Sequence, residues 1–149
     1  MKRSEQNVND TWRMEDMFSS DEAWEEDFEK ALEMISQYTK FSGKISESKE
    51  DLIAYFLFND EINLLVERLY VYSNQKYHED MAEAKYQAYS GKAQKLLVDI
   101  GSASAYFEPE LLGMDERKLL QWMEDERLSD YRRYVSEVLR KKEHTLDKT

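Results

Sequence analysis

The pair His78-Glu79 begins the pattern H-E-x-x-H, in which two histidines bind a single zinc ion. Histidines four residues apart on a helix face the same ion, and the glutamate between them acts as a general base toward water. Here the second histidine position is occupied by Ala82. The residues therefore predict no zinc centre at this point, and His78-Glu79 is interpreted as the polar start of a helix.

Other catalytic arrangements are equally incomplete. His144 is the only other histidine, and a site built from it, His78 and carboxylates is disfavoured. A diiron bundle needs Glu-x-x-His on two helices, but Gln75 and Lys141 stand three residues before the histidines. There is no G-x-S-x-G elbow, phosphate-binding glycine loop or EF-hand loop. The many acidic residues would allow a glycosidase-like pair of carboxylates, but the sequence points to no particular pair. The sequence thus predicts no catalytic, cofactor-binding or metal-binding residue in this chain.

Composition excludes further classes. The formal net charge is −11, whereas nucleic-acid binding uses a basic surface. The short basic runs at 132–134 and 140–142 are interpreted as solvated helix faces. The chain has no cysteine, so disulfides and thiolate chemistry are absent. The longest apolar run, residues 52–58, is too short to span a membrane, and the N-terminus lacks a signal-peptide core. We therefore expect a cytoplasmic protein without nucleic-acid or membrane partners.

The elements that would position any site are expected to be helices. Four glycines and one proline among 149 residues favour an all-α fold. Hydrophobic periodicity predicts a helical bundle of about five to six helices, mostly antiparallel. Residues 1–18 are expected to form an irregular N-terminal arm, and residues 19–149 a single helical domain.

Individual helix boundaries follow from local signals. Ser19 with Glu22 predicts a capping box at the first helix, and Ser48 with Asp51 a cap at the second. The third long helix is predicted to start near residues 78–80 and to carry a heptad-like seam through Phe107. Pro109 is expected to end that segment or to open a short turn after Phe107-Glu108. Two shorter helices follow, and residues 144–149 show no folding pattern.

Tyrosine is unusually frequent, with ten residues. A tyrosine side chain has a flat apolar body with a polar tip, so it suits both core boundaries and docking surfaces. Ordinary packing is favoured, and a docking or substrate-channel surface stays open as the alternative. The residues concerned are Tyr70, Tyr72, Tyr77, Tyr86 and Tyr89.

Six segments in order resemble the N-terminal helical domain of oligoendopeptidase F, of the thimet-type family of zinc oligopeptidases. They are TWRMEDMF, DEAWEEDFEKAL, ERLYVYSNQKYHEDM, AKYQAYSGKAQKL, SAYFEPELL and YRRYVSEVLRKKEHTLD. The resemblance implies that the zinc motif lies in a separate catalytic domain beyond Thr149. It implies no cofactor and no catalytic residue within this chain.

The resemblance also implies a role. Such an N-terminal domain forms one wall of a channel that confines peptide substrates beside the catalytic domain, and it cleaves nothing alone. The expected partners are that catalytic domain and peptides, and the isolated domain is expected to self-associate through the surface its partner would cover. A different class stays open: a free-standing helical interaction module that self-associates.

Overall fold

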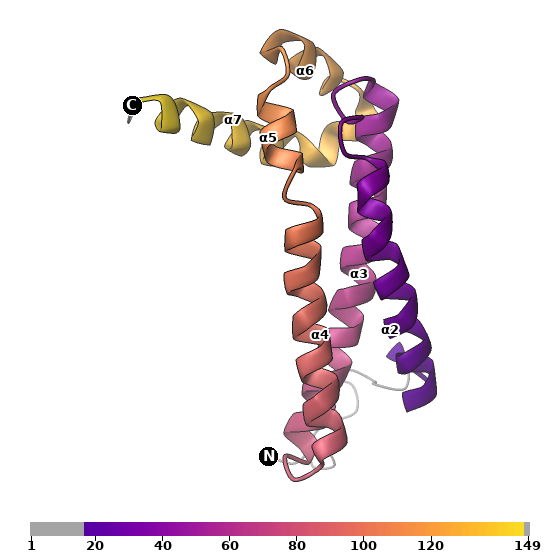
Figure 1. The fold of residues 1–149 in the computed structure, drawn as a ribbon. Coiled ribbons are helices and arrows are strands. Elements are labelled where there is room, and N and C mark those ends of the chain that lie inside the picture. The colour runs from indigo at the N-terminus through magenta and orange to yellow at the C-terminus, as the bar shows by residue number, and fades with distance from the viewer. Residues whose placement is uncertain (1–16, 148–149) are drawn as a thin grey trace. The chain divides into compact units, whose positions relative to one another are not determined.

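The structure, a computed structural model, describes the backbone of residues 17–147 and the side chains of residues 17–142. Within this part of the chain the regular elements are six α-helices and two short 3₁₀ helices (Figure 1). The predicted all-α bundle of five to six helices is confirmed. Residues 1–16 of the predicted N-terminal arm lie outside the described residues. The elements are α2 (Asp21–Ser36), η3 (Gln37–Lys40), α3 (Lys49–Glu79), α4 (Ala84–Ala103), α5 (Phe107–Leu112), α6 (Glu116–Trp122), η4 (Glu126–Tyr131) and α7 (Arg132–Asp147).

The described residues group into two compact units. The first unit contains residues up to Gln37 and residues 60–102, and thus α2, the second part of α3 and nearly all of α4. The second unit contains residues 38–59 and those from Ala103 onward, and thus the first part of α3 together with α5, α6, η4 and α7. α3 therefore contributes to both units. The single domain expected for residues 19–149 stays a prediction.

Three helices lie side by side in the first unit (Figure 1). Asp21 contacts Tyr72 and Trp24 contacts Leu69, so a step forward along α2 matches a step backward along α3. These helices are therefore antiparallel, and α4 returns antiparallel to α3 after the turn at residues 80–83. Their facing stripes form the core because apolar residues recur every three or four positions. Its buried members include Trp24, Ala31, Ile62, Val66, Leu69, Ala93, Leu96 and Ile100.

Aromatic rings dominate the core of the second unit. Tyr55 of α3 stacks on Phe107 of α5 with ring centroids 4.1 Å apart, and the neighbouring Phe56 stacks on Tyr131 of η4 at the same distance. Burial of such rings supplies both apolar area and a preferred stacking geometry. The nearly continuous apolar run at residues 52–58 is explained by this packing. Further buried residues are Tyr38, Ile45, Leu52, Leu111, Leu119, Leu128, Val135 and Val138.

Two helix starts were tested by the structure. The N-cap of α2 is Ser20, whose Oγ accepts a hydrogen bond from the Ala23 backbone N–H at 3.2 Å. The predicted cap at Ser19 was therefore wrong by one residue. The cap at Ser48 is confirmed, since its Oγ accepts from the Asp51 N–H at 3.1 Å and donates to the Asp51 carboxylate at 2.8 Å. Both caps satisfy backbone donors that have no partner within the helix.

Several predicted boundaries in the second half of the chain were wrong. His78 and Glu79 are the last residues of α3 rather than the start of the next helix. α4 ends at Ala103, and a turn at residues 104–106 separates it from α5. Pro109 lies inside the first turn of α5, where its missing N–H costs nothing. α7 continues to Asp147, so it includes residues that showed no folding pattern.

Candidate functional site

The geometry around His78 does not fit a metal centre. His78 and Glu79 are exposed at the end of α3, and Ala82 lies in the following turn rather than one helical turn further on. The ring of Tyr77 is the neighbour of the imidazole, with centroids 5.6 Å apart. Among residues 17–142, no group of three His, Cys, Asp or Glu side chains could hold a metal ion. The side chain of His144 lies outside that range.

Two of the five tyrosines singled out in the sequence donate hydrogen bonds to the same carboxylate. Tyr72 of α3 and Tyr86 of α4 donate their hydroxyls to Asp21 at the start of α2, at 3.0 Å and 3.1 Å. Lys85 adds an ion pair, with its Nζ 2.7 Å from the same carboxylate. The ammonium of Lys76 lies 5.7 Å from the centre of the Tyr72 ring. Asp21 therefore joins the three helices of the first unit through its hydrogen bonds.

The hydrogen bonds around Asp21 favour its ionised form. Burial alone would raise its pKa, but hydrogen bonds from Lys85, Tyr72 and Tyr86 outweigh burial and leave the pKa below its ordinary value. The pKa of the Tyr86 phenol is raised instead, mainly by burial and secondly by the hydrogen bond to Asp21. The cluster therefore stays ionised at Asp21 and protonated at Tyr86 near neutral pH.

The third tyrosine of the group packs in the core. Tyr89 is buried, and its ring stacks on Trp24. Its hydroxyl donates to the Glu25 carboxylate at 2.6 Å. Tyr72, Tyr86 and Tyr89 thus hold helices together, as the packing interpretation predicts. Tyr70 and Tyr77 are half-buried.

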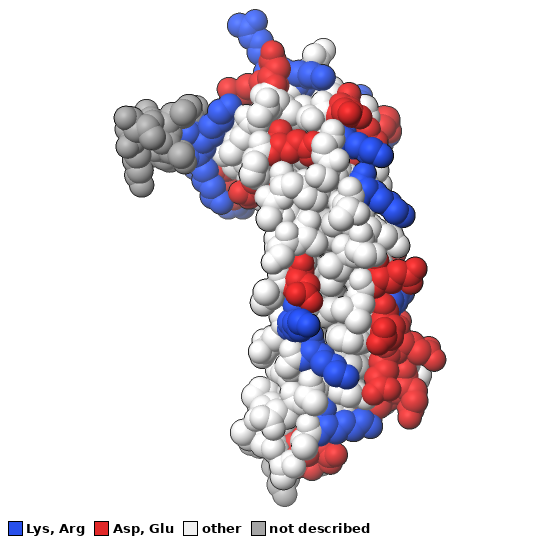
Figure 2. Space-filling view, viewed as in Figure 1, with Lys and Arg blue, Asp and Glu red and all other residues white. Residues whose placement is uncertain are grey.

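Acidic side chains crowd the outer face of α2. Figure 2 shows them as a continuous red area along that helix. The positive end of the helix dipole favours the first of them, while the others depend on solvent. Acidic residues on an exposed helix face are ordinary solvated surface, and they define no site on their own. They are Glu22, Glu26, Asp27, Glu29 and Glu33, with the single cation Lys30 on the same helix; Asp21 and Glu25 instead bind the tyrosines of α3 and α4.

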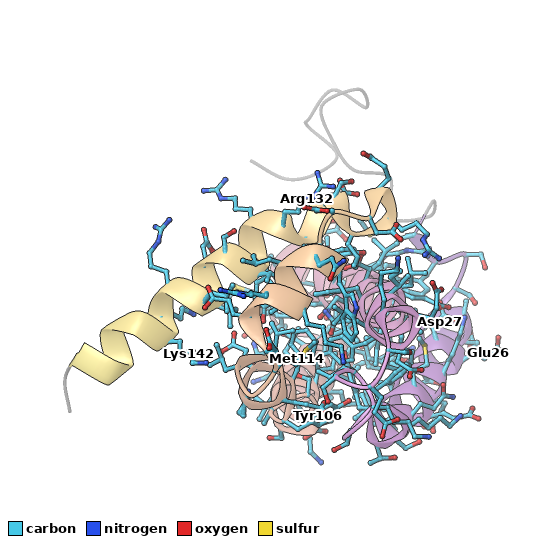
Figure 3. The ribbon with its side chains drawn as sticks, turned by 90° about the horizontal axis from the view of Figure 1, so that it is seen from above. Glu26, Asp27, Tyr106, Met114, Arg132 and Lys142 are labelled. Atoms are coloured by element: carbon cyan, nitrogen blue, oxygen red, sulfur yellow. The ribbon has the colours of Figure 1, made fainter. Side chains whose placement is uncertain are left out.

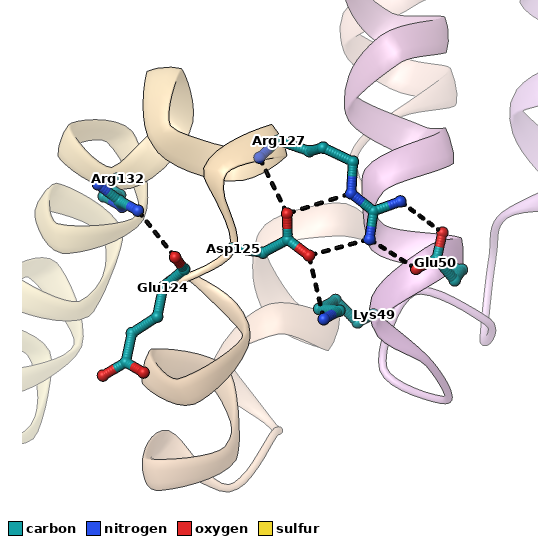
Figure 4. Close-up of polar contacts among 6 residues, drawn as sticks. All are labelled: Lys49, Glu50, Glu124, Asp125, Arg127 and Arg132. Atoms are coloured by element: carbon teal, nitrogen blue, oxygen red, sulfur yellow. Dashed lines mark hydrogen bonds and ion pairs between the residues drawn. The ribbon is translucent and has the colours of Figure 1, made fainter.

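Two carboxylates hold the side chain of Arg127 in the second unit (Figure 4). Its guanidinium donates to Glu50 at 2.8 and 3.0 Å, and to Asp125 at 2.9 and 3.1 Å. Lys49 completes the network with an ion pair to Asp125 at 3.0 Å. The bonds from Arg127 lower the pKa of both carboxyls. The network connects the start of α3 to the segment between α6 and η4.

A hollow of about 420 Å³ opens between α6 and α7. The Arg132 guanidinium lies beside it, fixed by hydrogen bonds to the backbone oxygens of Met123 and Glu124, the second of which is drawn in Figure 4. Figure 3 places Arg132 near the start of α7 and Lys142 toward its other end. Lys142 donates its Nζ to the Leu112 carbonyl at 2.9 Å. The residues lining the hollow are Leu120, Met123, Glu124, Arg132, Val135 and Ser136.

Sequence reasoning missed this hollow. The run at 132–134 had been interpreted as a solvated helix face, and Arg132, Arg133 and Tyr134 are indeed exposed, Tyr134 to 38%. The feature that sets Arg132 apart is its pair of bonds to the end of α6, nine and eight residues earlier. That pairing depends on the angle between two helices, which periodicity does not report. One clue was available: Trp122 and Met123 end a helix close to the arginine.

Comparison with known proteins gives consistent matches. A family model described as Oligopeptidase F matches residues 110–149. Oligopeptidase PepF of Bacillus subtilis is 36% identical over 145 residues, which is 97% of this chain and 22% of that protein. The chromosomal oligoendopeptidase F of Lactococcus lactis is 35% identical over 139 residues, covering 91% of this chain and 23% of that protein. This chain therefore spans less than a quarter of the length of these relatives.

A solved structure agrees with the sequence matches. The oligoendopeptidase F of Enterococcus faecium superposes with a TM-score of 0.69 and 26% identity, over 80% of this chain and 24% of that one. In sequence and in fold, the chain corresponds to the N-terminal part of an oligopeptidase. Within that class the chain matches the N-terminal domain of oligoendopeptidase F, as the ordered segments of its sequence predict.

No helix within residues 17–147 is both long and apolar enough to cross a membrane. The cytoplasmic location expected from the sequence stays a prediction.

Proposed function

We propose that this chain is the wall of a peptide channel in a zinc oligopeptidase, and that it confines and orients peptides without cleaving them. The observation that carries the proposal is the match along 97% of this chain to only 22% of Oligopeptidase PepF. A segment that corresponds to so small a share of a peptidase is one part of the working molecule. The rest of such a peptidase is the expected partner, and peptides are the expected substrates.

Chemistry in this proposal belongs to a separate catalytic domain. The described residues do not form a zinc site, because Ala82 stands where the motif needs a second histidine and no group of three His, Asp or Glu side chains could hold a metal ion. The zinc that the resemblance implies would therefore be bound by residues outside this segment. The helices described here supply a rigid scaffold, since Trp24 and the aromatic core of the second unit are buried.

A chimera tests the proposal directly. This chain would replace the matching segment of Bacillus subtilis PepF, and hydrolysis of short quenched-fluorescence peptides would be measured. We expect the chimera to be active and dependent on zinc, whereas the chain alone and PepF lacking the segment should show little or no turnover. Degradation of a small folded protein should stay undetectable. A chimera that folds normally by circular dichroism but is as inactive as the deletion would contradict the proposal.

The interaction-module alternative has a specific observation in its favour. Leu64 of α3 and Val98 of α4 are 59% and 67% exposed, which is unusual for large apolar side chains. We propose that the isolated chain self-associates through such residues. Light scattering after size exclusion, over a range of concentrations, should show a mass that rises with concentration. A monomer at every concentration would contradict self-association while leaving the channel proposal intact.

A further inference from the structure

The two arginines drawn in Figure 4 are held in opposite ways. Arg127 is fixed by the carboxylates of Glu50 and Asp125. Arg132 is fixed by neutral backbone oxygens: its Nε donates to the Met123 carbonyl at 2.7 Å and its Nη2 to the Glu124 carbonyl at 3.0 Å. The position of the second guanidinium is therefore set without neutralising its charge.

No carboxylate among residues 17–142 pairs with Arg132. The ion pairs of this region involve Arg127, Lys49 and Arg133 instead. The side chain of Glu124, although adjacent in space, points away from the guanidinium, which contacts only its backbone oxygen (Figure 4). An arginine carries five N–H donors, so the Nη1 donors stay available after these two bonds. Arg132 is exposed and positioned by these bonds, and no described carboxylate pairs with it, so an anionic ligand could reach its free N–H donors.

The hollow beside the guanidinium has a mixed lining, with Leu120, Met123 and Val135 as its apolar residues and Glu124 and Ser136 as polar ones. Met123 and Val135 are buried and form the base of the hollow, and Leu120 lies at its edge with 48% of its surface exposed. Ser136 adds a hydroxyl to the lining. The volume of about 420 Å³ falls within the range of small-ligand sites. A ligand that fits would combine an anionic group with an apolar one.

We propose that this hollow binds the C-terminal carboxylate of a peptide whose last side chain is apolar. The Nη1 donors of Arg132 bind the carboxylate, and Leu120, Met123 and Val135 contact the last side chain. A phosphate would not use the apolar base, and the acidic chain disfavours multiply charged anions. The proposal rests on the proposed function in one respect, because peptides are the expected substrates of the peptidase.

A pair of peptides separates this site from general adsorption. The probes are a short peptide ending in leucine with a free carboxylate and the same peptide as its C-terminal amide. Binding to the full 149-residue chain would be followed by chemical shifts of its amide groups. We expect the free acid to shift residues 120–136 and to bind roughly 10- to 100-fold more tightly than the amide, because charge-assisted hydrogen bonds are lost in the amide. A peptide ending in glycine should bind less tightly than the one ending in leucine.

Two variants assign the effect to the hollow. Arg132→Gln removes the cation, and it should bring the free acid to the affinity of the amide. Because that change also removes bonds to the end of α6, Ser136→Glu provides a second test: it places an anion in the hollow from an exposed position on α7. It should weaken the free acid about tenfold or more. Gln94→Glu, an equal charge change on the exposed face of α4, should leave binding unchanged.

Equal binding of acid and amide would overturn the proposal, as would no binding at about 10 mM peptide. An acid preference that survives both Arg132→Gln and Ser136→Glu would overturn the assignment to this hollow. The chimera with PepF is judged separately. If the chimera is active but the chain shows no preference for the free acid, only the carboxylate-site proposal is refuted. If the chain prefers the free acid but the chimera is inactive, only the channel proposal is refuted.

Discussion

Trp24 and Tyr89 lie face to face across the first unit, with ring centroids 4.1 Å apart and planes only 4° from parallel. Each ring is also held at its polar end. The indole Nε1 donates to the Leu69 carbonyl at 2.9 Å, and the phenol donates to Glu25. One residue of α2 thus contacts α4 through its ring and α3 through its N–H.

Trp24→Ala should be among the most damaging single changes in this chain. The side chain is fully buried, so its removal leaves a cavity and should lower the free energy of unfolding by about 3–5 kcal/mol. Trp24→Phe keeps a ring but loses the hydrogen bond to Leu69, and should cost about 1–2 kcal/mol. Urea denaturation followed by circular dichroism measures both. Leu64→Ala, at an exposed site, serves as control, and a cost equal to that of Trp24→Ala would contradict this assignment.

The Asp21 cluster should make stability depend on pH. The folded-state pKa of Asp21 lies below its unfolded value, so its carboxylate contributes stability above the ordinary carboxyl range. That contribution is lost as the pH falls below about 4. Asp21→Asn should therefore destabilise the protein at pH 7, and the difference should shrink as acid is added. Thermal unfolding across this pH range is the measurement, with Glu26→Gln on the same helix as control for the loss of one charge. A difference that is constant with pH would argue against an ionised cluster.

Local patterns predicted the helices, but not which residues of a stripe are buried. Apolar residues three, four or seven positions apart on α2 include Trp24, Ala31 and Leu32, and such spacing predicts one buried stripe. Trp24 and Ala31 are fully buried, but Leu32 is 39% exposed, and Met34 is buried instead. The reason is that α2 packs on two helices, so its buried face is wider than one stripe and displaced from it. Periodicity locates a face to within one residue or so along the helix.

Contacts between distant residues could not be predicted from one sequence. Asp21 and Tyr86 are 65 residues apart, and their meeting depends on the length of the turn after α3 and on the register of two helices. The sequence showed the high frequency of tyrosine and favoured a packing role for it. It did not show that two of the tyrosines share the carboxylate of Asp21. Arg132 is a similar case, because an arginine on a polar helix face gives no sign that the backbone oxygens just after α6 will fix it.

Glu110 is expected to destabilise the folded chain at neutral pH. Its Oε2 is buried without a hydrogen-bond partner among the described residues, while its Oε1 has a long contact of 3.5 Å with the Ser46 hydroxyl. Burial raises the pKa of this carboxyl, and bonds from Ser46 and the Gly43 backbone offset the rise only in part. An acid with a raised folded-state pKa binds its proton more readily when folded. Stability is therefore greatest below the unfolded pKa of about 4 and falls as the pH rises through the folded value.

Glu110→Gln should remove that penalty. The variant should melt at a higher temperature than the wild type at pH 7, and the two should converge in acid. Differential scanning fluorimetry from acidic to neutral pH measures this convergence. Glu61→Gln, at an exposed position on α3, controls for the loss of one negative charge. If Glu110→Gln melted at a lower temperature than the wild type at pH 7, the Glu110 carboxylate would have to be fully hydrogen-bonded in solution. That result would contradict the buried, unpaired Oε2 of the structure.

The Arg127 network should contribute in a way that salt removes. Its groups lie at the surface, and exposed ion pairs gain little once mobile ions screen them. Two features favour a measurable effect nevertheless: the bidentate geometry toward Glu50, and the shared contact with Asp125. Arg127→Gln should lower the urea midpoint in dilute buffer, and the loss should be smaller at about 1 M NaCl.

Arg127→Lys separates charge from geometry. A lysine keeps the positive charge but has no planar fork for two carboxylates, so most of the loss should persist if the bidentate bonds are responsible. If lysine restores the wild-type midpoint, charge alone is sufficient. Arg117→Gln, on the exposed face of α6, serves as control for the removal of one cation. An equal loss at low and high salt would mean that the Arg127 side chain acts through packing rather than through its ion pairs.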